Sequence, residues 1–83
     1  MDSWLDSARK RIAVATGVSA EHMELTEQDA RALLDLARVA AHDSGDRTNA
    51  PLVCFLVGLT VGRNPDLSLA ELTNVAASTA TER

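Results

Sequence analysis

The chain has 83 residues, of which 46% are hydrophobic and 24% charged, and its formal net charge is −4. A chain this short forms one small domain, residues 1–83, with a thin core, because compact domains span about 50–200 residues. The acidic balance opposes contact with a phosphate backbone, so no nucleic acid partner is expected. Aromatic residues are scarce and small aliphatic ones abundant, which favours an all-α fold.

The sequence carries no recognisable export or membrane signal. Its start, MDSWLDSARKR, lacks the basic segment followed by an apolar stretch that defines a signal peptide. The longest apolar run, residues 50–61, is shorter than the roughly 20 residues that a membrane-spanning helix needs. Cys54 is the single cysteine, which excludes an internal disulfide. We therefore expect a cytoplasmic protein that does not enter a membrane.

The first predicted helix begins at Asp2 or Ser3, either of which can cap it, and ends near Thr16, before Gly17. Its basic cluster, residues 9–11, is expected to face water. The apolar residues recur at helical spacing and form one stripe: Trp4, Leu5, Ala8, Ile12 and Ala15.

Residues 17–25 read as a connection, after which Thr26 and Asp29 have the spacing of a capping box. This pair predicts a second helix over residues 27–42. Its charged residues lie three or four positions apart on the solvent side. The expected buried stripe is Ala30, Leu33, Leu34, Ala37 and Ala41.

The turn-forming segment DSGDRTN ends the second helix, and Pro51 suits the first turn of a third helix over about 51–62. This third helix is apolar nearly all round, and such a helix has to be surrounded. Either the other three helices enclose it or part of it meets a second chain, so a homodimer through this helix stays open.

The segment LSLAEL predicts the start of a fourth helix, with Ser68 as N-cap, Glu71 as its reciprocal partner, and Leu67 packing on Leu72. The helix should run to about Ser78, and residues 79–83 should fray. The expected architecture is a compact four-helix bundle with an apolar third helix.

The chain offers little for catalysis or metal binding. His22, His42 and Cys54 lie far apart in sequence and lack the short regular spacing of zinc ligands. No Gly-x-Ser-x-Gly elbow or glycine-rich phosphate loop is present. We therefore expect no enzyme activity, no cofactor and no metal.

The polar segment 42–51 is the one candidate site, with His42, Asp46, Arg47 and Asn49 as its candidate residues. Each has a structural interpretation: His42 suits a helix C-terminus, Asp46 and Arg47 can pair, and Thr48 or Asn49 can cap the third helix. In the functional interpretation, Arg47, His42 and the free N–H groups that begin this helix bind a carboxylate or phosphate. Both interpretations stay open.

The combination LLDLARVAAHDSGDRTNAPLVCFLVGLTVGR, preceded by a WLD helix, resembles a small actinobacterial family of unknown function. The similarity covers residues 4–76. The resemblance implies an association with molybdenum cofactor guanylyltransferase and brings no catalytic residues with it. Its most characteristic residues are His42, Asp46, Arg47, Ala50, Pro51, Leu52, Phe55, Leu56 and Gly58.

We therefore expect a non-catalytic helical module that binds another protein, such as a molybdenum cofactor guanylyltransferase, through segment 42–51 and the apolar surface beside it. The alternative is a module that binds a small anion, a phosphate or carboxylate, at the same segment.

Overall fold

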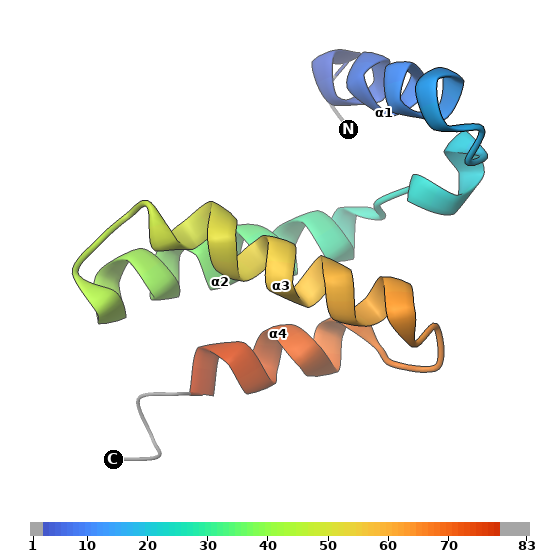
Figure 1. Ribbon diagram of the computed structural model, residues 1–83. Helices are drawn as coiled ribbons and strands as arrows, with labels where there is room; N and C mark the ends of the chain where they lie inside the picture. The colour runs from blue at the N-terminus through green and yellow to red at the C-terminus, as the bar shows by residue number, and fades with distance from the viewer. Residues whose placement is uncertain (1–2, 79–83) are drawn as a thin grey trace.

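The computed structural model describes residues 3–78 of the chain. Within this range there are four α-helices, one short 3-10 helix and no strand, so the expected all-α, four-helix class is confirmed (Figure 1). The expected fraying of residues 79–83 and the start at Asp2 lie outside the described residues. In chain order the elements are α1 (Ser3–Thr16), η1 (Ala20–Met23), α2 (Glu27–Ser44), α3 (Asn49–Arg63) and α4 (Leu69–Ala77).

The start of α2 is fixed by the predicted capping box. The Thr26 hydroxyl accepts a hydrogen bond from the Asp29 N–H at 3.0 Å, and Asp29 Oδ2 accepts one from the Thr26 N–H at 3.1 Å. The helix ends at Gly45, whose φ of 74° is the left-handed conformation that glycine adopts without strain. It therefore runs two residues past the predicted end.

The start of α4 has one of the two hydrogen bonds of the predicted capping box. Ser68 Oγ accepts a hydrogen bond from the Glu71 N–H at 3.2 Å, which confirms Ser68 as the N-cap. Among residues 3–78, however, the Glu71 side chain makes no return bond to the Ser68 backbone. One of the two expected bonds therefore fixes the start of this helix.

The packed part of the molecule consists of α2, α3 and α4. Helix α2 contacts both α3 and α4, and α3 also contacts α4 (Figure 1). Each helix contributes one buried side chain: Leu36 from α2, Val57 from α3 and Thr73 from α4 are 2%, 6% and 5% exposed. Helix α1 instead makes its main contacts with η1 and lies to one side of the other three helices. The core is therefore very small.

The other helices do not enclose α3, which was the first of the two alternatives that the sequence left open. One side of α3 packs on α2 and α4, but Leu52, Phe55 and Leu56 are about 60% exposed on the other side. Leu34 of α2, expected in the buried stripe, is exposed as well. The physical reason is the position of α1, which would have to lie across α3 to cover it and instead packs on η1.

The chain exposes more surface than a compact protein of its mass. Its accessible area is 6366 Å², against about 4,800 Å² expected for a folded monomer of this size. Its radius of gyration is 13.7 Å, against about 12 Å expected. Within residues 3–78, no helix combines the length and apolar character that crossing a membrane requires.

Candidate partner-binding groove

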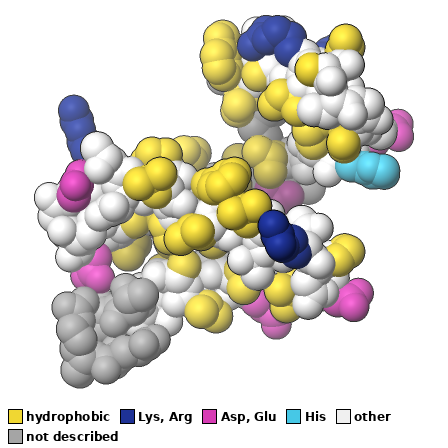
Figure 2. Space-filling model, viewed as in Figure 1, with side chains coloured by type: hydrophobic (Ala, Val, Ile, Leu, Met, Phe, Trp, Pro, Cys, Tyr) yellow, Lys and Arg dark blue, Asp and Glu magenta, His cyan; other side chains and the backbone are white. Residues whose placement is uncertain are grey.

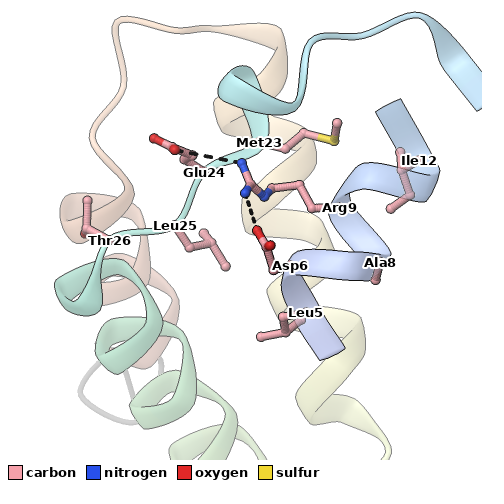
Figure 3. A pocket seen from close by; sticks show the side chains of 9 residues that line it. All are labelled: Leu5, Asp6, Ala8, Arg9, Ile12, Met23, Glu24, Leu25 and Thr26. Carbon is pink, nitrogen blue, oxygen red and sulfur yellow. Dashed lines mark hydrogen bonds and ion pairs between the residues drawn. The ribbon is translucent and has the colours of Figure 1, made fainter. Parts of the chain in front are cut away.

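An apolar groove lies where α1 and η1 meet the start of α2 (Figure 3). It encloses about 490 Å³, within the range of known ligand pockets. We call it the α1 groove. One wall is the apolar face of α1, and the other is the segment that leads into α2. Its apolar lining residues are Leu5, Ala8, Ile12, Met23 and Leu25, and its polar ones are Asp6, Arg9, Glu24 and Thr26.

Arg9 holds the groove in shape. Its Nη1 donates a hydrogen bond to the Ala20 carbonyl oxygen at 2.9 Å and lies 3.8 Å from a Glu24 carboxylate oxygen, while its Nη2 pairs with Asp6. One guanidinium therefore joins α1 to both ends of η1, as the dashed lines in Figure 3 show in part. The helical periodicity places Arg9 toward solvent, because partners 11 and 15 positions away leave no signal at helical spacing.

The polar groups of the groove are already engaged. Hydrogen bonds from Arg9 and Lys10 hold the pKa of the Asp6 carboxyl below its ordinary value, because they stabilise its charged form. The Thr26 hydroxyl serves the α2 cap. The groove therefore offers a partner apolar contact, and the charges that line it are paired with one another.

The sequence-predicted site residues lie elsewhere, where α2 passes into α3. His42 is in the last turn of α2, Asp46 and Arg47 are in the turn that follows, and Asn49 begins α3. All four are exposed, and none of them lines the α1 groove. Asp46 has a structural role: its Oδ1 accepts hydrogen bonds from the Thr48 N–H at 2.9 Å and from the Thr48 hydroxyl at 2.7 Å. These bonds lower the pKa of the Asp46 carboxyl.

The N–H groups at the start of α3 are occupied. Besides the Thr48 N–H, the N–H of Asn49 donates to the Asp46 carbonyl and that of Ala50 to the Arg47 carbonyl, both at 3.1 Å, and Pro51 has none. The Thr48 side chain, one of the two candidate caps, makes no cap hydrogen bond and donates to Asp46 instead. The expectation of free N–H groups was therefore wrong, and anion binding retains only the side chains of His42 and Arg47 as support.

Cys54 is placed as a packing residue. Its thiol donates a weak hydrogen bond to the Leu33 carbonyl, with sulfur and oxygen 3.6 Å apart. Partial burial raises the pKa of this thiol, which keeps it protonated at neutral pH. Cys54 is therefore a poor nucleophile and helps to hold α3 against α2.

A family model described as a domain of unknown function, DUF6457, matches residues 1–83, and the chain belongs to this family. Its description states no activity, ligand or partner. No curated protein and no solved structure matches the chain. The part of the sequence resemblance that names a family of unknown function is therefore confirmed.

Proposed function

We propose that this DUF6457 domain is a non-catalytic protein-interaction module that binds an apolar helical segment of another protein in the α1 groove. One observation carries the proposal: the apolar face of α1 lines an open groove instead of a core. Leu5 and Ile12, which the periodicity assigns to a buried stripe, are 42% and 51% exposed. An uncovered apolar helix face beside a groove is typical of a docking site for a helix.

A protein segment fits this groove better than a small molecule. The groove is open along α1, and the apolar surface continues beyond it onto Trp4, which is 68% exposed. A small ligand would leave that continuation in water. A helix laid along α1 would cover the groove and its margin together. Inside the groove the charge of Arg9 is paired with Asp6 and Glu24, and at the margin the Arg11 guanidinium lies over the Trp4 ring.

For the partner we propose a molybdenum cofactor guanylyltransferase, in the cytoplasm. The resemblance of residues 4–76 to a family associated with that enzyme supports the assignment. The segment 42–51 remains a candidate second contact, with Arg47 as the cation at its edge. The free cysteine Cys54 is compatible with a reducing compartment.

Two substitutions on the same helix test the groove. Ile12 lines it, whereas Val14 is 88% exposed and does not line it. Both Ile12→Asp and Val14→Asp exchange a β-branched side chain for a carboxylate on α1. Calorimetric titration of the guanylyltransferase should give wild-type affinity with Val14→Asp and at least about 10-fold weaker binding with Ile12→Asp, because a buried unpaired carboxylate is costly.

The outcomes separate the parts of the proposal. If the wild-type chain does not bind the guanylyltransferase, the partner is wrong. If it binds and the two variants are equal, the groove is wrong. A third variant, Arg47→Ala, addresses segment 42–51: unchanged affinity removes that segment from the interface.

A further inference from the structure

We infer that a second copy of this chain packs on the outer side of α3, as an antiparallel, two-fold symmetric helix pair. The surface concerned is the α3 stripe, which consists of Leu52, Phe55, Leu56 and Leu59 and is 60%, 63%, 59% and 39% exposed. Figure 2 shows hydrophobic side chains open to view over this part of the molecule. The α3 stripe is separate from the α1 groove, so the inference does not depend on the proposed function.

The spacing of the α3 stripe suits a symmetric pair. Its members follow at i, i+3, i+4 and i+7, the pattern of a helix face that packs against another helix. The pattern is also symmetric about the point between Phe55 and Leu56. In an antiparallel pair with its two-fold axis at that point, Leu52 lies opposite Leu59 of the second copy, and Phe55 opposite Leu56. Every apolar side chain of the stripe then meets another, as a two-fold interface requires.

The charges along α3 permit the same pairing. Each chain carries a net charge of −4, so two copies repel unless the contact avoids charge. Helix α3 carries no ionisable carboxylate or cation from Asn49 to Gly62, and Arg63 lies one turn beyond Leu59 on the same side. In the antiparallel pair, Arg63 lies opposite the start of α3 in the second copy, beside Asp46. Since Asp43, at the end of α2, and Asp46, in the turn, outnumber Arg47, each end of the interface brings a cation to an acidic region.

The exposed area matches what this interface needs. The chain exposes 6366 Å², roughly 1,600 Å² more than a folded monomer of its mass. A stable interface of standard size removes about 800 Å² from each partner. The excess is therefore larger than the area that one such interface removes from each partner. A core with two buried hydrophobic side chains, Leu36 and Val57, is also small for a monomer of this length.

Sedimentation equilibrium at several concentrations tests the pair. The wild-type chain should sediment as a dimer at micromolar concentration. Leu56→Glu places two carboxylates at the centre of the interface and should raise the dimer dissociation constant at least about 100-fold. Leu34→Glu is the matched control, because Leu34 is 71% exposed on α2, outside the α3 stripe, and it should leave the constant unchanged.

Disulfide cross-linking tests the direction of the pair and does not require a charged variant to fold. In a Cys54→Ala background, Leu52→Cys combined with Leu59→Cys should give covalent dimers under mild oxidation, because the two positions face each other across the axis. Each single cysteine should stay monomeric, since its counterpart in the second copy lies about 10 Å along the helix.

Three results would overturn the inference. The first is a monomeric wild-type chain at all concentrations. The second is a dimer that Leu56→Glu and Leu34→Glu affect equally. The third is efficient cross-linking by the single cysteines, which indicates a parallel pair.

Discussion

Asp46 is the residue on which the turn between α2 and α3 depends. Its carboxylate accepts two hydrogen bonds from Thr48 and its carbonyl accepts one from Asn49, so a single residue fixes the first turn of α3. The sequence marks Asp46 as a candidate for anion or partner binding. The structure gives its side chain a local acceptor role instead, in the manner of an Asx turn.

Asp46 should make stability depend on pH. Because its pKa is lower in the folded chain, its charged form stabilises the fold above the ordinary carboxyl pKa, and this contribution is lost as the pH falls through the lowered value. Asp46→Ala should therefore be less stable than the wild type at neutral pH, and the difference should shrink on acidification. Urea unfolding of both proteins between pH 7 and about pH 2 measures it.

Asp66→Ala is the control for this prediction. Asp66 is exposed in the loop before α4, where its backbone N–H, and not its carboxylate, makes a hydrogen bond to the Asn64 side chain. A difference between Asp46→Ala and the wild type that stays constant with pH, or that Asp66→Ala reproduces, contradicts the role assigned to the Asp46 carboxylate.

At the scale of elements, helix boundaries could be predicted from the sequence to within two residues, and helix placement could not. Thr26, Asp29 and Ser68 form caps with residues three positions away, so a local pattern contains the information. The position of α1 depends on Arg9, which contacts Ala20 and Glu24 across a connection. The short helix η1, begun by the Ser19 hydroxyl, was missed for the same reason, since its single turn leaves no periodicity.

The candidate site follows the same division. The sequence predicts correctly that segment 42–51 forms a polar turn and that an apolar helix follows it, because turn-forming residues and Pro51 act locally. The sequence could not predict which N–H groups at the start of α3 are free to bind a ligand. The backbone carbonyls of Asp46 and Arg47 accept hydrogen bonds from these groups, and such backbone contacts leave no mark on the sequence. The α1 groove was missed because an apolar stripe with Leu5 and Ile12 reads as core whether or not another element covers it.

The cap of α2 gives a prediction at the level of one helix. Thr26→Ala removes the hydroxyl that accepts from the Asp29 N–H and should lower the free energy of unfolding by about 1 kcal/mol. Thr60→Ala is a matched control, because the Thr60 hydroxyl only donates back to the Leu56 carbonyl within α3 and alanine is the better helix former. Equal losses of stability in urea unfolding would contradict the cap assignment.

At the scale of the molecule, the chain divides into a packed part, α2 to α4, and an arm, α1 with η1. The helices of the packed part contact one another in all three pairs, whereas α1 makes its main contacts within the arm. The two apolar surfaces described above lie on different parts of the chain. The arm and the start of α2 line the α1 groove, whereas the α3 stripe belongs to the packed part. We therefore propose that partner binding and self-association use different segments.

A shortened chain tests this division. A variant that begins at residue 24 keeps the α2 cap and removes α1 and η1. It should unfold cooperatively with the helical content of α2 to α4, retain self-association through the α3 stripe, and lose binding of the guanylyltransferase. Circular dichroism during heating, sedimentation and calorimetry measure the three properties. A gradual, non-cooperative melting curve would show that α1 is needed for the packed part to fold.

The single tryptophan of the chain gives the arm an optical signature of its own. Trp4 lies on α1 next to the α1 groove, 68% exposed, with the Arg11 guanidinium 5.9 Å from the centre of its ring. The fluorescence maximum of an indole ring moves to shorter wavelength when the ring leaves water, so the emission maximum of Trp4 reports binding at the arm. Association of two packed parts through α3 leaves Trp4 in solvent, and one spectrum can therefore tell the two binding events apart in a mixture where both occur.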